Sequence, residues 1–88
     1  MPSVHVSLPA ALTSPDQPVV LRCEAGSVGE ALRAAVAQAP RFAPRIFYGD
    51  RLLVSVTLNG RHLEPAAALA TTLAPGDRVD VMPPVAGG

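Results

Sequence analysis

The sequence predicts an α+β roll, in which a mixed sheet of four to five strands carries one main helix across one face. Three observations lead to this fold class. Apolar and polar residues of the 88-residue chain alternate, as in half-buried strands, over residues 3–8, 19–24, 52–59 and 78–82. Between the second and third of these segments, apolar residues recur at helical spacing. Two hairpins flanking one helix can form a single twisted sheet with the helix on one side.

The first two strands are expected over residues 3–8 and 19–24. Their apolar residues share one face in each strand, namely Val4, Val6 and Leu8 in the first and Val19, Leu21 and Cys23 in the second. The segment 9–18 contains three prolines and is typical of a connection. We therefore expect a hairpin with a long loop.

The helix is expected to begin after Ser27. Ser27 and Glu30 have the Ser-x-x-Glu spacing of a capping box, in which the hydroxyl accepts from the amide three residues on. Pro40 is expected to end the helix. Its apolar face comprises Val28, Leu32, Ala35, Val36 and Ala39. This face can cover the sheet.

The segment 41–51 mixes aromatic, apolar and charged residues and is expected to form an irregular, partly packed connection. A third strand is expected over 52–59, since its apolar residues alternate, at Leu52, Val54, Val56 and Leu58. Asn59-Gly60 then predicts a tight turn, because both residue types tolerate positive φ.

A short strand is expected near 61–63, followed by an Ala-rich loop or helical turn. Pro75-Gly76-Asp77 predicts a second turn, where Pro presets φ and Gly accepts a positive φ. The final strand is expected over 78–82. Having no successor, it can pair beside the first strand and leave its end free at the sheet edge.

Composition and charge exclude several function classes. Seven Arg, spread along the chain, balance seven acidic residues, so a nucleic-acid partner is not expected. The absence of Lys removes any side-chain amine that could accept an isopeptide bond, which excludes Lys-linked polymers of this chain. One Cys cannot form an internal disulfide, and no apolar stretch is long enough to span a bilayer. We expect a cytoplasmic protein with no membrane association.

No side chain within the domain is predicted to be catalytic. Cys23 is in phase with the apolar face of its strand, which favours burial. His5 and His62 lack partners at metal-ligand spacing, so no metal site is expected. Asp77 and Asp80 are expected at a turn and on an outward strand face. We predict that the chain is not itself an enzyme and binds no cofactor of its own.

The carboxyl end is the strongest functional signal, and we divide the chain into a domain over 1–82 and an extended tail over 83–88. The tail consists of Pro83, Pro84, Val85, Ala86, Gly87 and Gly88. Two glycines give it a minimal cross-section, and two prolines hold its start extended. Five extended residues reach roughly 16 Å, enough to enter a partner's active site. A frayed terminus is the alternative interpretation.

A carboxylate needs activation before it can react, and we expect a partner enzyme to activate it with ATP as an acyl adenylate. Attack by sulfide or a persulfide on the activated carbonyl of Gly88 leaves a thiocarboxylate. Attack by a thiol and then an amine gives protein conjugation. The reactive group is therefore predicted at Gly88 itself.

These motifs together resemble the MoaD/ThiS family of sulfur carriers, which have a ubiquitin-like β-grasp fold. The resemblance is carried by Asn59-Gly60, by Leu73-Ala74-Pro75-Gly76-Asp77-Arg78-Val79 and by Met82-Pro83-Pro84-Val85-Ala86-Gly87-Gly88. It implies that an E1-like adenylyltransferase of the MoeB/ThiF type adenylates Gly88, and that a synthase takes sulfur from the resulting thiocarboxylate. It also implies that the tail enters each partner, and that Ser55, Thr57 and Met82, on the sheet face away from the helix, form the docking surface.

The resemblance favours one pathway and leaves others open. The ending Pro-Pro-Val-Ala-Gly-Gly is most similar to that of the small subunit of molybdopterin synthase, whose large subunit performs the chemistry of molybdenum cofactor biosynthesis. The opening Val6-Ser7-Leu8-Pro9 is more similar to actinobacterial carriers that supply cysteine synthesis, with a cysteine synthase as partner. A carrier for thiazole/thiamine or natural-product biosynthesis, and a ubiquitin-like protein modifier, remain alternatives.

Overall fold

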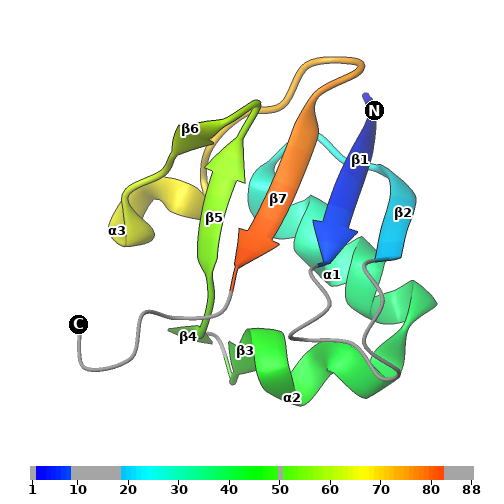
Figure 1. The fold of residues 1–88 in the computed structure, drawn as a ribbon, viewed down its shortest axis with the longest axis vertical. Helices are drawn as coiled ribbons and strands as arrows, with labels where there is room; N and C mark the ends of the chain where they lie inside the picture. The colour runs from blue at the N-terminus through cyan, green and yellow to red at the C-terminus, as the bar shows by residue number, and fades with distance from the viewer. Residues whose placement is uncertain (1, 9–18, 50, 83–88) are drawn as a thin grey trace.

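The computed structural model describes residues 2–8, 19–49 and 51–82, so the predictions for 9–18 and for the tail lie outside the described residues. One five-stranded sheet has the order β2-β1-β7-β5-β6, and α1 (Val28–Gln38) lies across one face of it (Figure 1). Its strands are β1 (Ser3–Leu8), β2 (Val19–Glu24), β5 (Ser55–Leu58), β6 (Arg61–His62) and β7 (Arg78–Met82). β1 and β7 are parallel, and the other pairs are antiparallel. The predicted α+β roll with a mixed sheet is confirmed.

The bounds predicted for the first, second and last strands are confirmed. β1 pairs with β2 from Ser3 opposite Glu24 to Leu8 opposite Val19. β7 pairs beside β1, as expected, but the β5–β6 hairpin occupies its other side. The expectation that its end lies at the sheet edge is therefore wrong, because β7 is the central strand.

The helix begins and ends where its caps predict. The Ser27 hydroxyl accepts from the backbone N–H of Glu30 at 3.2 Å. The Glu30 carboxylate in turn accepts from the N–H of Gly26 at 3.1 Å, one residue further back than the usual capping box. At the other end, the N–H of Ala39 bonds to the carbonyl of Ala35, before Pro40. Of the predicted apolar face, the first three residues are buried, whereas Val36 and Ala39 are only partly so.

The segment 40–54 is more regular than predicted. It forms η2 (Pro40–Phe42), α2 (Ala43–Ile46) and a separate two-stranded sheet of β3 (Phe47–Tyr48) and β4 (Arg51–Leu52). The strand predicted over 52–59 is therefore broken, because Leu52 pairs with Phe47 and the main sheet resumes only at Ser55. Phe42 and Ile46 contribute buried side chains to the core.

Both predicted turns are confirmed by their backbone angles. Asn59 and Gly60 have φ of 51° and 86°, and Gly76 has φ of 84°. Between the turns, the chain forms β6 and α3 (Pro65–Ala68). The core is mainly aliphatic, and its largest fully buried side chains are Leu8, Leu32, Ile46, Val4, Val6, Val28, Val56, Val79 and Val81.

Candidate functional site

The central strand β7 separates the core from a solvent-facing surface. Val79 and Val81 are buried on the side of α1. Arg78, Asp80 and Met82 alternate with them and lie on the opposite side, which we call the open face. Met82 is 49% exposed and is the last residue that the structure describes. The strand therefore ends on an exposed apolar side chain at the base of the tail.

The predicted docking residues lie together on the open face. Ser55 pairs directly with Met82 across β5 and β7, and Thr57 pairs with Asp80 two positions further along. Directly opposed residues point to the same side of a sheet. Met82 is exposed and does not fill a gap in the core. The grouping of the three residues is thus observed, whereas their docking role stays a prediction.

Strand pairing adds residues that the sequence alone did not place. The row through Asp80 crosses the whole sheet and consists of Val20, Ser7, Asp80, Thr57 and His62. Val20 is 60% exposed and supplies a second apolar contact on this face. A neighbouring row contains Arg22, His5 and Arg78. The apolar–polar alternation along each strand predicts which residues point outward. Only the pairing register shows which of these residues are neighbours on the sheet.

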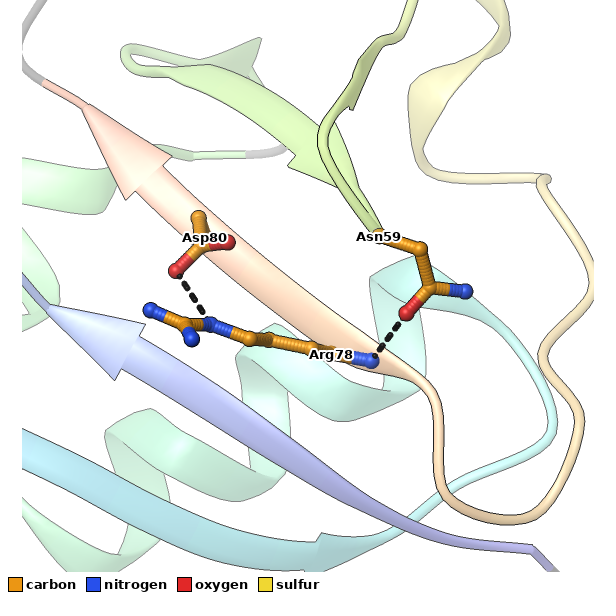
Figure 2. A network of polar contacts seen from close by, with 3 residues as sticks. All are labelled: Asn59, Arg78 and Asp80. Atoms are coloured by element: carbon orange, nitrogen blue, oxygen red, sulfur yellow. Dashed lines mark hydrogen bonds and ion pairs between the residues drawn. The ribbon is translucent and has the colours of Figure 1, made fainter.

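Arg78 and Asp80 form an ion pair along β7 on the open face (Figure 2). The Arg78 Nε donates to Asp80 Oδ1 at 3.0 Å, and both side chains are partly exposed to solvent. Asp80 therefore occupies an outward strand position, as predicted. Its charge is balanced by Arg78, which does not favour a role as a general base.

A polar clamp fixes the beginning of β7. Asn59 accepts from the backbone N–H of Arg78 at 2.8 Å through its side-chain oxygen (Figure 2) and donates from its amide to Asp77 Oδ1 at 2.9 Å. The other oxygen of Asp77 accepts from the N–H of Ala74 at 2.7 Å. The Ala74 N–H, assisted by the Asn59 amide, lowers the pKa of Asp77. We call Asn59, Ala74, Asp77 and Arg78 the β7 clamp, and its role is to hold the beginning of β7 in place.

The remaining candidate groups do not form a reactive centre. Cys23 is buried, which raises the pKa of its thiol and keeps it protonated. Gln38 Nε2 lies 3.5 Å from its sulfur. The prediction that Cys23 belongs to the core is confirmed. His5 and His62 lie exposed on the open face, and no group of three potential metal ligands occurs in the described parts of the chain.

The tail residues Pro83, Pro84, Val85, Ala86, Gly87 and Gly88 lie outside the described residues, so their predicted role stays a prediction. The structure does describe where the tail begins. Met82 is paired with Ser55, and two residues earlier the N–H of Leu53 bonds to the carbonyl of Ile46 at 2.8 Å. β7 therefore points toward the end of the molecule formed by α2, β3 and β4 (Figure 1).

A family model extends the match over this tail. Residues 9–88 match the ThiS family. The chain belongs to the ThiS family. This ThiS-family chain is also 39% identical over 64 residues, or 70% of each sequence, to the small archaeal modifier protein 3 of Haloferax volcanii. The family thus includes proteins described as modifiers beside the sulfur carriers that the sequence motifs resemble.

Solved structures support the fold of this ThiS-family chain. The crystal structure of SAMP1 from Haloferax volcanii has a TM-score of 0.71 and 29% identity, and the match covers 98% of this chain and 99% of that one. A chain in the Amycolatopsis orientalis BexX/CysO complex has a TM-score of 0.78 at 21% identity, with 97% and 99% coverage, which is a likeness of fold alone. The ubiquitin-like β-grasp fold is therefore shown. No helix within the described ranges is long and apolar enough to cross a membrane.

Proposed function

We propose that this protein is a sulfur carrier whose Gly88 carboxylate becomes a thiocarboxylate. The observation that carries the proposal is the ThiS-family match, which continues through the six residues after β7 to Gly88. In the described part of the β-grasp domain, the Cys23 thiol is buried and the carboxylates of Asp77 and Asp80 are held by hydrogen bonds or an ion pair. These engaged groups favour a carrier over an enzyme.

Activation begins with the tail carboxylate. Its oxygen attacks the α-phosphate of ATP in the active site of an E1-like adenylyltransferase of the MoeB/ThiF type, and pyrophosphate leaves. The acyl adenylate that forms has AMP as a good leaving group. Sulfide then attacks the carbonyl carbon and displaces AMP, which gives the thiocarboxylate directly. If an enzyme persulfide attacks instead, the product is an acyl disulfide; a second thiol then attacks the enzyme's sulfur, which releases the thiocarboxylate of Gly88 and leaves a disulfide on the enzyme. ATP is a substrate of the partner, and this chain contributes the acceptor carboxylate.

Tail and open face have separate tasks in this proposal. The six residues from 83 to 88 span roughly 20 Å when extended, so Gly88 reaches a buried active site while the domain stays outside. Pro83 to Gly87 occupy the access channel, and their prolines and glycine keep the segment extended and slim. Ser55, Thr57 and Met82 contact the partner beside the channel, with Met82 as the apolar anchor.

The acceptor that we propose first is the large subunit of a molybdopterin synthase, with this chain as the small subunit. The ending Pro-Pro-Val-Ala-Gly-Gly supports this assignment. Cysteine, thiazole/thiamine and natural-product biosynthesis use the same carrier chemistry, and a cysteine synthase is the acceptor in the first of these alternatives. They differ only in the protein that receives the sulfur.

Protein modification is the second candidate function. It is favoured by the 39% identity to the small archaeal modifier protein 3 of Haloferax volcanii. The same adenylate of Gly88 serves this function when a thiol and then a target amine replace sulfide as nucleophiles. Because the chain has no Lys, it would be attached to other proteins and would not form Lys-linked chains with itself.

Intact mass spectrometry tests the carrier function. The full chain is incubated with the E1-like adenylyltransferase of its organism, ATP and sulfide. We expect the mass to rise by the difference between one sulfur and one oxygen, and fragmentation to place the change on Gly88. A chain lacking Gly88 serves as the negative control and should remain unmodified with an unchanged unfolding temperature.

The Cys23→Ala variant distinguishes a thiocarboxylate from sulfur held on the cysteine. We expect this variant to form the thiocarboxylate fully, because the thiol is buried. A sulfur mass increase that disappears in Cys23→Ala, or that occurs without ATP, would exclude the proposed route. Sulfur transfer from the thiocarboxylated chain to a molybdopterin synthase large subunit or to a cysteine synthase then identifies the acceptor. Peptides in which Gly88 is joined to lysines of other proteins would instead favour the modifier function.

A further inference from the structure

The charges of this neutral chain are unevenly distributed. Residues 31–63 contain five of the seven Arg and a single acidic residue, Asp50. The rest of the chain contains two Arg and six acidic residues. The two parts therefore carry opposite net charges of equal size, which a total of zero conceals.

Three arginines of the positive part lie on consecutive elements at one end of the domain. Arg41, Arg45 and Arg51 come from η2, α2 and β4, which follow one another through a short hairpin, and all three are exposed. Their side chains form no hydrogen bond or ion pair within the described residues. The Arg41 guanidinium lies 4.8 Å from the ring centroid of Phe42, which keeps its charge at the surface.

An exposed tyrosine lies among these arginines. Tyr48 is 78% exposed, the largest exposed fraction among the exposed large apolar side chains, and it is paired with Arg51 across β3 and β4. Tyrosine and arginine are both enriched in protein interfaces and among the residues that dominate their binding energy. We call Arg41, Arg45, Tyr48 and Arg51 the cationic surface.

The cationic surface lies at the end of the domain from which the tail leaves. Figure 1 shows α2, β3 and β4 at the lower end, toward which β7 points. The contacts agree, because Met82 pairs with Ser55 and Leu53 bonds to Ile46 on α2. Any partner that receives the tail must therefore come close to these arginines.

Three possible occupants of this surface are disfavoured. In its described part, a second copy of the chain offers only Glu24 and Glu64 as exposed carboxylates without a partner, because Glu30, Asp77 and Asp80 are engaged with its own groups. The phosphates of ATP meet Gly88 roughly 20 Å from Met82 and do not reach the domain. Nucleic-acid binding usually involves more phosphate contacts than three arginines supply, and the rest of the chain is acidic.

We propose that the cationic surface docks on an acidic rim around the channel of the E1-like adenylyltransferase that receives the tail. This inference rests on the proposed function and names the chemistry of its first partner. Guanidinium groups bind carboxylates with two parallel hydrogen bonds, which Lys cannot do. The positive end faces the acidic rim during approach, so the domain arrives with its tail forward.

Association kinetics test this proposal. Full-length chain and adenylyltransferase are mixed in a stopped-flow instrument at increasing NaCl concentrations, without ATP. For the native chain, we expect the association rate constant to fall steeply with salt. In the Arg41→Gln, Arg45→Gln, Arg51→Gln triple variant, we expect association to be about tenfold slower at low salt and to depend only weakly on salt. Dissociation should change less than association.

A matched pair of charge reversals locates the effect. Arg45 and Arg61 are both exposed, and neither side chain forms a hydrogen bond or ion pair within the described residues. Arg61 begins β6, beyond the Asn59-Gly60 turn at the other end of β5. Arg45→Glu should slow association several-fold, whereas Arg61→Glu, with the same change in net charge, should have little effect. Unfolding temperatures verify that both variants are folded.

Each outcome decides the proposal. Equal slowing by the two reversals, association that does not depend on salt, or no binding to the adenylyltransferase would overturn it. Self-association that the triple variant loses, or tighter binding to a short RNA than to the enzyme, would overturn it in favour of another occupant. Salt-dependent binding through these arginines without thiocarboxylate formation would instead refute the proposed function and leave the docking surface intact.

Discussion

The two ends of the central strand differ in how their polar groups are used. Where β7 begins, the β7 clamp joins the Asn59-Gly60 turn to the Pro75-Gly76-Asp77 turn through side-chain hydrogen bonds. Where β7 ends, the exposed groups are Met82 and the cationic surface, whose arginines have no polar partner among the described residues. One end satisfies its polar groups internally, and the other leaves them available to a partner.

This difference suggests that stability and recognition occupy opposite ends of one strand. A tail that must enter a partner's channel benefits from a base with a fixed direction, since a loosely held strand would lose binding energy to ordering on association. The clamp supplies this fixed direction at a distance from the interface. Changes at the first end should therefore alter stability, and changes at the second should alter binding.

The largest effect on stability is expected for Asn59→Ala. This change removes both side-chain hydrogen bonds of Asn59 and forces Ala to adopt the φ of 51°. We expect the free energy of unfolding to fall by about 2 kcal/mol in urea titrations. Asn59→Gly separates the two causes, because Gly tolerates this φ and should lose about half as much. An unchanged urea midpoint in Asn59→Ala would show that the clamp does not fix the strand.

A smaller effect is expected where only the backbone is strained. Gly76 and Gly49 lie at opposite ends of the molecule, with φ of 84° and 62°, and a Cβ added at either would meet no atom within 4 Å. Gly→Ala should therefore cost about 1 kcal/mol at each position, from the positive φ alone. Equal decreases in the free energy of unfolding for Gly76→Ala and Gly49→Ala would show that backbone strain is the same at both ends of the molecule. The difference between the ends would then lie in their polar contacts. A much larger loss at Gly76 would contradict this.

The clamp should also make stability depend on pH through Asp77. Hydrogen bonds from Ala74 and Asn59 lower the pKa of Asp77 in the folded state. Its contribution is therefore fully present above the ordinary carboxyl pKa of about 4 and is lost as the pH falls through the lower folded value. Urea midpoints measured from pH 7 to pH 2.5 should show a smaller acid-induced decrease in Asp77→Asn than in the native chain. Identical pH profiles would exclude this role of the carboxylate.

Much of this fold follows from local patterns, and the exceptions have one cause. β1, β2 and β7 have the predicted bounds because their alternation is clear and turn residues flank them. The predicted strand over 52–59 is broken, although Val54 and Val56 are buried as expected. Alternation reports which side of a strand is buried and not which strand it pairs with. Leu52 satisfies its half of the pattern in the small β3–β4 sheet.

The candidate site could be predicted only where it depends on one strand or on adjacent residues. Alternation within each strand is enough to place Ser55, Thr57 and Met82 opposite the buried residues, whereas their docking role came from the family resemblance. The row from Val20 to His62 needs the register of five strands. The cationic surface was missed because its arginines are separated in the sequence and come together only through two helical turns and a hairpin. The tail remains a prediction from sequence.

The smallest effect on stability is expected at the end that we assign to recognition. Replacing Arg41, Arg45 and Arg51 by Gln should change the free energy of unfolding by less than about 0.5 kcal/mol, because exposed groups without polar partners contribute little. The change should be a slight gain at low salt, since the arginines repel one another, and should vanish at high salt. Thermal unfolding at two NaCl concentrations measures it. A loss above about 1 kcal/mol would mean that these arginines support the fold, and the separation of stability from recognition along β7 would then be wrong.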